Sequence, residues 1–562
     1  MNTEILGIIA MFTVTMLLAF PLGKYIAKVY GGGKMGGDFI FNPLEKIIFK
    51  IAGVNPNTEM TWQQHLKALL TINLVWFLLG MLILMIQGSL PLNPDNNPSM
   101  SADLAFNTII SFVVNCNLQH YSGETGMSYL GQIWLMFLQF VSAGVGMAAA
   151  AIVFRAFRDK STKELGNFYS FFVKSCTRIL LPLCIVVASI LSFQGTPMTF
   201  EGKDTITNLQ GDKVEVSRGP AAAFVAIKHI GTNGGGFFGA NGTHPLENPT
   251  YLSNMTEMIA QFIIPVAMVF AFGFFINRRK LSWMIFGVMT IGFLVLAIPN
   301  IAMEMNGNPN IASMGIDNQL GAMEGKETRI GAAASGFWSI VTTVISTGSI
   351  NSMHDSSMPL SGMNELLAMM INAFYGGVGV GILNFFVFIV LAVFISGLMV
   401  GRTPEFLGKK IEAREMKIAM MIALLHPFLI LVGTALTAAM PSQGAATLNN
   451  PGFHGFSEML YEFTSSAANN GSGFEGLGDN TPWWNIATGF VLILGRFLPI
   501  IGPVAIAGLL AEKRFIPESA GTLKTDTATF GMVIFAVIAI IAALAFFPAL
   551  ALGPIAEYFS LK

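Results

Sequence analysis

Four short apolar stretches of this chain each end in a small polar tripeptide, and this recurrence constrains the fold more than any other feature. The tripeptides are Asn115-Cys116-Asn117, Thr232-Asn233-Gly234, Ser346-Thr347-Gly348 and Asn469-Asn470-Gly471. Their third residues are 117, 114 and 123 positions apart. Because self-similarity at a nearly fixed period is the signature of a repeat architecture, we expect four copies of one structural unit.

The composition indicates the solvent in which these units fold. Of the 562 residues, 53% are hydrophobic and 11% are charged, whereas soluble domains typically carry about 25% charged residues. A helix needs about 20 apolar residues to cross the hydrocarbon core of a bilayer. Ten segments qualify: 4–28, 66–88, 129–154, 168–194, 252–276, 281–301, 363–400, 417–440, 483–511 and 527–551. We therefore predict an all-α polytopic membrane protein with ten transmembrane helices.

The stretches before the tripeptides, at 103–114, 219–230, 331–344 and 456–468, are too short to cross. Segments of this length are re-entrant or are ordinary buried helices. Their regular spacing and shared polar ending favour re-entrance, both over buried helices and over four unrelated surface loops. Each unit then contains two crossings, so the repeats are parallel and not inverted. We expect four span–pore-helix–filter–span repeats around a pseudo-fourfold pore.

The charges orient this arrangement in the membrane. The net charge of −1 creates no field that would attract nucleic acid. Of the 31 Lys and Arg residues, 23 lie in alternate loops, which by the positive-inside rule face the cytoplasm. Both termini and all four hairpins are therefore expected outside. The predicted divisions are a first transmembrane helix with a cytoplasmic loop (1–60), repeat 1 (61–160), repeat 2 (161–279), repeat 3 with a broken second helix (280–410), repeat 4 (411–515) and a last transmembrane helix (516–562).

The segments that return from the short helices carry the predicted chemistry. Non-helical backbone at membrane depth is tolerated only where it is buried or lines water. The return sequences NCNLQHYSGE, GTNGGGFFGANG, STGSINSM and NNGSGFEGLG are rich in Gly, Asn, Ser and Thr. Rings of carbonyls can replace the hydration shell of a dehydrated cation, and the negative C-terminal end of each short helix also favours a cation. An anion pathway would need Arg or Lys, and only Lys228 lies nearby.

All twelve tripeptide residues are therefore candidate filter residues. Glycine at the third position, as in Gly234, Gly348 and Gly471, permits a positive φ that lets successive carbonyls point the same way. Asn117 occupies this position in the first repeat, and Asn tolerates the same conformation. Gln119 follows two residues later and could project its amide into the passage.

The return sequences NCNLQHYSGE, TNGGGFFGANGTHPLENPT and NNGSGFEGLGDNTPWWN, together with the loop motif GRTPEFLGKK at 401–410, resemble those of the KdpA family. Members of this family are the potassium-binding subunits of the bacterial Kdp potassium pump. The resemblance covers the whole chain. The loop motif separates it from the Trk, Ktr and HKT potassium translocators, which share the fourfold hairpin plan.

The resemblance implies a subunit of the bacterial plasma membrane that takes K⁺ from outside with high affinity. Its implied partners are the P-type ATPase subunit KdpB, the small subunits KdpC and KdpF, and membrane lipids. The ion would leave the pore sideways towards KdpB. The family's filter glutamine falls on Gln119 and its filter glycines on Gly234, Gly348 and Gly471. Its arginines in the cytoplasmic loop and the last repeat fall on Arg402 and Arg496.

Two features inside the spans have alternative interpretations. Arg496 lies mid-span, where insertion scales assign arginine a cost of roughly 2.5–3.5 kcal/mol, so it should face protein or water. It is either a structural partner for an acid or carbonyls, or a positive charge below the filter that discourages straight-through conduction. The segment 363–400 is too long for one span and contains Gly376, Gly377, Gly379 and Gly381. These glycines allow close helix packing or a break under the filter, and the resemblance favours the break.

The chain carries no nucleotide-binding or catalytic motif. A Walker A pattern and a DKTG-type phosphorylation motif are both missing, and the largest predicted cytoplasmic loop spans only 29–65. We expect no catalytic site, no organic cofactor and K⁺ as the bound ion. His120, His229, His244 and His354 form no i, i+4 pair that would indicate another metal. The main alternative is a passive or gradient-driven Trk/Ktr-like translocator; a membrane enzyme or scaffold would need polar clusters that the spans lack.

Overall fold

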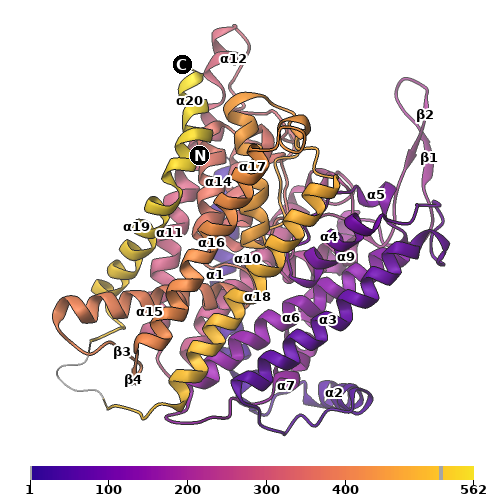
Figure 1. Cartoon of the computed structure of the whole chain (residues 1–562). Helices are drawn as coiled ribbons and strands as arrows, with labels where there is room; N and C mark the ends of the chain where they lie inside the picture. Colours follow the sequence, from indigo (N-terminus) through magenta and orange to yellow (C-terminus); the bar gives the residue numbers. More distant parts are fainter. Residues whose placement is uncertain (1–2, 518–522, 562) are drawn as a thin grey trace.

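The computed structural model describes residues 3–517 and 523–561, and within them the predicted all-α membrane fold is confirmed (Figure 1). In this part of the chain ten helices are long and apolar enough to cross a membrane. They are α1 (Thr3–Gly31), α3 (Trp62–Ile86), α6 (Tyr129–Arg158), the continuous run of α7 (Phe168–Lys174), a π-helical turn (Ser175–Leu180) and α8 (Leu181–Gln194), α10 (Tyr251–Phe275), α11 (Arg279–Asn306), α15 (Val380–Val400), α16 (Ala413–Ala438), α18 (Pro482–Glu512) and α19 (Ala528–Leu550). The last continues through a π-helical turn (Ala551–Ile555) into α20 (Ala556–Ser560).

Four shorter helices lie between pairs of spans, where the sequence predicts half-crossings. They are α4 (Ala102–Val113), α9 (Ala221–Ile230), α13 (Ala332–Ile345) and α17 (Gly452–Ala468). At about 1.5 Å per residue they reach about 15–25 Å, less than the hydrocarbon core of about 30 Å. Every residue of α13 is buried, so this helix is enclosed by its neighbours. Each is followed by an irregular return segment and the next span.

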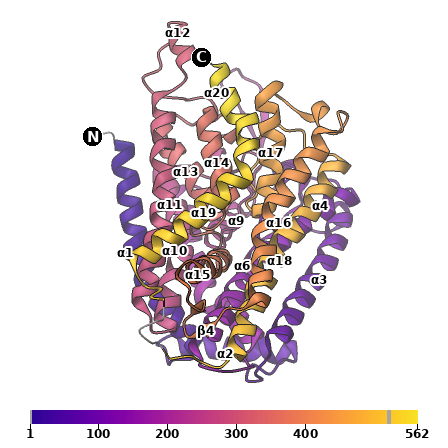
Figure 2. The ribbon, with the colours of Figure 1, turned by 60° about the vertical axis from the view of Figure 1, so that its left-hand side comes forward.

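The seventh apolar segment forms two helices and not one. α14 (Pro359–Ile371) ends where Asn372 adopts a left-handed φ of 44°, and α15 begins at Val380. Between them Tyr375, Gly376 and Gly379 also have positive φ. A side chain at Gly381 would collide with the carbonyl oxygen of Tyr375, so the chain can fold back here only with glycine. Figure 1 shows α15 lying across the neighbouring spans, and Figure 2 views it nearly end on.

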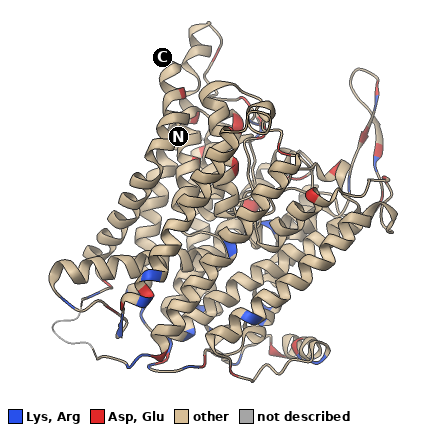
Figure 3. Ribbon diagram, in the orientation of Figure 1, with Lys and Arg blue, Asp and Glu red and all other residues tan. Residues whose placement is uncertain are grey.

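The two ends of the bundle differ in structure and in charge. One end carries α2 (Asp38–Ala52) and the small antiparallel hairpin of β3 (Glu405–Phe406) and β4 (Lys409–Lys410). The other end carries α5 (Gly123–Gly126), α12 (Pro309–Ser313) and the antiparallel hairpin of β1 (Asp204–Thr207) and β2 (Lys213–Val216). Figure 3 shows most Lys and Arg at the α2 end. The described residues nearest both termini lie towards the end that carries β1 and β2, which we call the hairpin end (Figure 1). Residues 1–2, 518–522 and 562 fall in the predicted first and last divisions and lie outside the described part.

Candidate functional site

The four tripeptides share one backbone conformation. In each of them the first and third residues have a positive φ and the middle residue does not. The first residues are Asn115, Thr232, Ser346 and Asn469, with φ between 49° and 63°, and the third residues are Asn117, Gly234, Gly348 and Gly471, with φ between 59° and 101°. The sequence predicts this conformation for the third position only. The first position was missed because Thr and Ser rarely adopt a left-handed φ.

Contacts between repeats close the tripeptides into a ring, which we call the pore ring. A side chain at Gly234 would collide with the carbonyl oxygen of Thr347, one at Gly348 with that of Asn470, and one at Gly471 with that of Cys116. The remaining seam, between repeats 1 and 2, contains the side chain of Asn117, which donates a hydrogen bond of 2.8 Å to the carbonyl oxygen of Gly234. The predicted filter residues of four distant segments therefore meet around one axis, each repeat touching the next.

Several side-chain donors of the pore ring bind neighbouring groups, whereas Asn117 Oδ1, Asn233 Oδ1 and Thr347 Oγ1 have no hydrogen-bond partner among the described residues. The amide of Asn233 donates to Asn115 Oδ1 at 2.7 Å, and that of Asn470 donates to the carbonyl oxygen of Thr342 at 2.9 Å. The hydroxyl of Ser346 donates to the carbonyl oxygen of Ala468 at 3.0 Å. These donors hold neighbouring groups of the ring in place.

Gln119, whose amide the sequence predicts could project into the passage, lines a cavity beside the pore ring and is hydrogen-bonded at both ends of its amide. Its Oε1 accepts a hydrogen bond from the Gly236 amide at 2.7 Å, and its Nε2 donates to the Gly236 carbonyl at 3.0 Å and to the Tyr121 hydroxyl at 3.0 Å. Gln119 therefore joins the return segments of repeats 1 and 2 just beyond the pore ring.

In three of the four repeats, the side chain four residues before the tripeptide ties the return segment to the short helix. In the third repeat this residue is Thr342, whose hydroxyl has no hydrogen-bond partner among the described residues. Ser111 donates to the Leu118 carbonyl at 2.8 Å, and Ser465 accepts from the Gly471 amide at 2.9 Å. In repeat 2 this position is Lys228, whose ammonium donates to the Gly235 carbonyl at 2.9 Å. Sequence reasoning gave Lys228 no role. Aligning the four repeats on their tripeptides would have revealed it, as a lysine among Ser and Thr.

Lys228 is fully buried and its charge is compensated locally. The ammonium forms an ion pair with Glu247, which is also fully buried, and donates to Asn241 Oδ1 at 2.7 Å. Glu247 in turn accepts from the backbone amides of Phe237 and Phe238 at 3.1 and 3.3 Å. A buried charge is tolerated only when it is paired and hydrogen-bonded. This network therefore fixes the return segment of repeat 2 behind the pore ring.

A polar cavity of about 280 Å³, which we call the vestibule, lies on the hairpin side of the pore ring. Its lining includes Gln119, His120, Gly235, Gly348, Gly471, Glu475 and Asp479. Burial lowers the pKa of His120, but the nearby Asp479 and Glu462 carboxylates raise it to about 9. Carboxylates beside the mouth of a passage attract cations electrostatically.

Beneath the pore ring lies the interrupted segment, residues 372–379, between α14 and α15. The Val378 amide donates to Thr232 Oγ1 at 2.9 Å, and the Gly376 amide donates to the Val344 carbonyl at 3.3 Å. A Cβ added to Gly146 would lie 2.5 Å from the Val378 carbonyl oxygen and 3.2 Å from Arg496 Nη2. The predicted glycine cluster therefore attaches directly to the underside of repeats 2 and 3.

The two predicted arginines occupy different regions. Arg496 is only 5% exposed, and its Nη2 has no hydrogen-bond partner among the described residues. It reaches the wall beneath the pore ring from α18. Arg402 is exposed beyond the far end of α15, a helix of 21 residues, which at about 1.5 Å per residue measures about 30 Å. The structure therefore brings Arg496, but not Arg402, to the pore ring.

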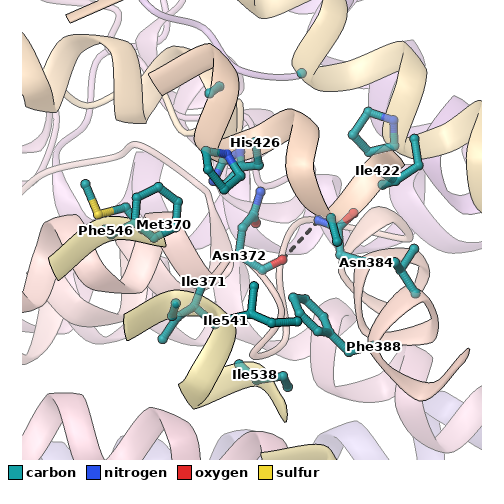
Figure 4. Close-up of a pocket in the computed structure, with 17 residues that line it drawn as sticks. Met370, Ile371, Asn372, Asn384, Phe388, Ile422, His426, Ile538, Ile541 and Phe546 are labelled. Atoms are coloured by element: carbon teal, nitrogen blue, oxygen red, sulfur yellow. Dashed lines mark hydrogen bonds between the residues drawn. The ribbon is translucent and has the colours of Figure 1, made fainter. Parts of the chain in front are cut away.

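A second cavity, of about 60 Å³, adjoins the interrupted segment (Figure 4). Its wall includes residues of α16 and α19 and Ala467, the penultimate residue of α17. Asn384 donates to the Asn372 carbonyl at 3.0 Å, and His426 Nε2 lies 3.0 Å from the Met369 carbonyl oxygen. The cavity is thus apolar with a few polar groups at the helix break.

Comparisons with known proteins agree on one family. The model of the family described as "KdpA: Potassium-transporting ATPase A subunit" matches residues 9–559. A protein of Flavobacterium johnsoniae is 72% identical over all of both chains, and one of Phocaeicola vulgatus is 61% identical over all of both chains. One of Geobacillus kaustophilus is 45% identical over 98% of each chain. All three are named "Potassium-transporting ATPase potassium-binding subunit".

A comparison of structures adds the fold. The crystal structure of the potassium transporter TrkH from Vibrio parahaemolyticus matches with a TM-score of 0.51, over 89% of this chain and 98% of that one. The sequences are 16% identical, so this likeness concerns the fold alone. The repeated arrangement of spans and short helices is therefore shared with a solved potassium transporter.

Proposed function

Because this chain belongs to the KdpA family of potassium-transporting ATPase A subunits, we propose that it is the subunit that selects and binds K⁺ in an ATP-driven uptake pump. The observation that carries this proposal is the closure of four tripeptides into one pore ring. A ring of backbone carbonyls can replace the water shell of K⁺. The carboxyl ends of the four short helices face the ring and favour a cation.

The selectivity of the pore ring rests on backbone oxygens held by an engaged scaffold. The amides of Asn233 and Asn470 already bind other backbone or side-chain oxygens. Asn117 likewise uses its amide nitrogen to bind the Gly234 carbonyl. We therefore assign K⁺ coordination to tripeptide carbonyls, with Gln119 acting as a brace between repeats 1 and 2. No organic cofactor is needed for this chemistry.

Ions reach the pore ring from the vestibule. By the positive-inside rule the end rich in Lys and Arg faces the cytoplasm, so the hairpin end and both termini face outside. Glu475 and Asp479 lie in the vestibule wall and attract cations towards the ring. The membrane is then the bacterial plasma membrane, with its lipids around the outer spans.

Passage straight through is opposed beneath the pore ring. The interrupted segment lies against repeats 2 and 3, and the guanidinium of Arg496, whose Nη2 has no hydrogen-bond partner among the described residues, lies beside it. A cation leaving the ring would meet this positive charge in a low-dielectric region, where charges interact strongly. The lateral cavity beside Asn372 and His426 offers polar groups in another direction (Figure 4). We propose that K⁺ leaves sideways through it, with Arg496 and the glycines acting in gating and Arg402 in coupling at the cytoplasmic surface.

The energy for uptake comes from a partner. We assign ATP hydrolysis to a P-type ATPase subunit, KdpB, assembled with KdpC and KdpF, and no catalytic step to this chain. A passive or gradient-driven translocator remains the second candidate, because the solved TrkH transporter shares the fold. Copurification of an ATPase with this chain from its native membrane supports the pump, and its absence supports the translocator.

The test of the pore ring uses the intact complex. Gly234→Asp puts a fixed charge and a side chain where the Thr347 carbonyl lies. We expect the K⁺ concentration for half-maximal ATPase activity to rise by about tenfold or more, equivalent to ~1.4 kcal/mol of binding. Gly36→Asp is the control, because nothing lies within 4 Å of its Cβ position. Unchanged K⁺ dependence in an assembled Gly234→Asp complex would contradict the assignment.

A further inference from the structure

Three side chains from two repeats converge at the edge of the vestibule. His120 follows Gln119 in repeat 1, Glu462 lies on α17, and Asp479 lies in the return segment of repeat 4. His120 Nε2 is 3.2 Å from Glu462 Oε1 and 3.9 Å from Asp479 Oδ2. One ligand atom from each residue lies within 4.8 Å of the others. His120 and Glu462 are buried, while the Asp479 side chain is 28% exposed.

The hydrogen bonds around His120 leave its Nε2 facing the two carboxylates. Its Nδ1 lies 2.7 Å from Asn485 Oδ1. The amide nitrogen of Asn485 donates to Asp103 Oδ2 at 2.8 Å, which assigns Oδ1 as the acceptor towards His120. Nδ1 therefore carries a proton, and a metal ion at Nε2 would displace the proton that faces the carboxylates. A histidine that binds a metal through one nitrogen usually donates its other N–H to such a partner.

The spacing suits a tetrahedral transition-metal ion. Zinc binds imidazole nitrogen and carboxylate oxygen at about 2.0–2.2 Å, which places neighbouring tetrahedral ligands about 3.3–3.5 Å apart. The two distances from His120 Nε2, 3.2 and 3.9 Å, bracket this value. A small shift of the partly exposed Asp479 would complete the geometry. One nitrogen and two oxygens suit Zn²⁺ and similar ions, whereas Ca²⁺ and Mg²⁺ prefer oxygen ligands only.

We propose that His120, Glu462 and Asp479 bind a divalent transition-metal ion such as Zn²⁺, with its fourth ligand, a water molecule, in the vestibule. The site shares the vestibule wall with Gly235, Gly348 and Gly471. A bound divalent ion adds positive charge where K⁺ enters, so it inhibits K⁺ entry. This inhibition rests on the proposed function of the pore ring, but the metal binding itself does not.

A second cluster on the same side of the molecule provides a comparison. Asp355, His454 and Glu458 also bring ligand atoms within 4.8 Å of one another. The ring nitrogens of His454 are engaged as those of His120 are: Nε2 lies 2.9 Å from Asp355 Oδ1 and Nδ1 lies 2.9 Å from Glu557 Oε1. None of these residues lines the vestibule, so a metal bound in this cluster adds its charge away from the pore ring.

The first arm of the test measures binding alone. The purified complex is stripped of metal with a chelator, equilibrated with Zn²⁺ in the absence of K⁺ and ATP, and its bound zinc is measured after gel filtration. We expect His120→Gln and Asp479→Asn each to lose about one zinc per complex relative to the wild type, the stoichiometry of a single three-ligand site. His454→Gln should keep the zinc of the vestibule site, so any zinc that it loses reports on the second cluster. Equal zinc content in the wild type and in an assembled Asp479→Asn complex, whose changed side chain is partly exposed, overturns the site.

The second arm measures inhibition. K⁺-stimulated ATPase activity is followed against Zn²⁺ at low and at saturating K⁺. We expect Zn²⁺ to raise the K⁺ concentration for half-maximal activity by about tenfold in the wild type and in His454→Gln, and to lose this effect in Asp479→Asn. Zinc bound at the site with an unshifted K⁺ dependence overturns the inhibition. A complex without K⁺-stimulated activity refutes the proposed function instead, and the binding arm still decides the site.

Discussion

The ammonium of Lys228 donates a 2.9 Å hydrogen bond to the carbonyl oxygen of Gly235, one residue beyond the pore ring. Ser111 makes the equivalent bond to Leu118 in repeat 1 with an uncharged hydroxyl. The repeats therefore share a backbone arrangement here, but in repeat 2 the side chain that holds it is charged. That charge lies behind the ring and holds a carbonyl of the return segment in place.

Removing this charge should alter K⁺ binding as well as stability. Lys228→Met leaves Glu247 buried without its partner, which costs about 3–5 kcal/mol in comparable proteins. It also releases the Gly235 carbonyl, so we expect the K⁺ concentration for half-maximal ATPase activity to rise. The matched control is Lys326→Met, because Lys326 and Glu304 form another buried pair, at 2.9 Å. Equal K⁺ dependence in the two assembled variants would show that Lys228 acts on stability alone.

The seams of the pore ring should tolerate no side chain. Gly471 has a φ of 101°, and an added Cβ would collide with the Cys116 carbonyl oxygen. We expect Gly471→Ala to weaken K⁺ affinity by about tenfold or more, or ~1.4 kcal/mol. Gly452→Ala is the control, because its φ is 75° but nothing lies within 4 Å. It carries only the strain of a left-handed alanine, about 1–2 kcal/mol, and K⁺ affinity measured by ATPase titration should not change.

Arg496 should limit passive conduction. In Arg496→Met the positive charge beneath the pore ring is lost, and we expect passive K⁺ leak to rise on the order of tenfold, equivalent to about 1.4 kcal/mol off the barrier. The measurement is K⁺ flux in vesicles that contain the complex and no ATP. Arg279→Met, which changes an exposed arginine at the start of α11, is the control. Wild-type flux together with wild-type K⁺-stimulated ATPase activity would exclude this role.

The link between α17 and α20 should weaken at alkaline pH. Burial lowers the pKa of His454, but its bonds to Asp355 and Glu557 raise the pKa to about 10. Because the folded pKa exceeds the ordinary value of about 6.5, the stabilisation is complete below that pH and is lost as the pH rises towards 10. Thermal unfolding of the wild type and His454→Gln should therefore differ most near pH 6. The gap in Tm should shrink by ~2 °C or more by pH 9; a constant gap would refute the charged state of His454.

Much of the architecture follows from local sequence. Length and apolarity predict the spans, and shortness with a polar ending predicts α4, α9, α13 and α17. The boundaries are less secure, since α17 begins at Gly452 and not near 456. The glycines of 376–381 indicated a possible break, because glycine adopts positive φ without a steric cost. These features depend on residues that are adjacent in the chain, so local sequence patterns are enough to predict them.

The site required the tertiary structure. The left-handed Thr232 and Ser346 have no sequence signal, since the energy that holds them there comes from packing between repeats. The contacts of Asn117 with Gly234, Lys228 with Glu247, and His120 with Glu462 join residues 117, 19 and 342 positions apart. The sequence by itself determined four membrane-embedded units and the chemistry of their tips. Only the packing of those units decided which carbonyls face one another and which charges are paired, because these depend on distances in space that no spacing along the chain encodes.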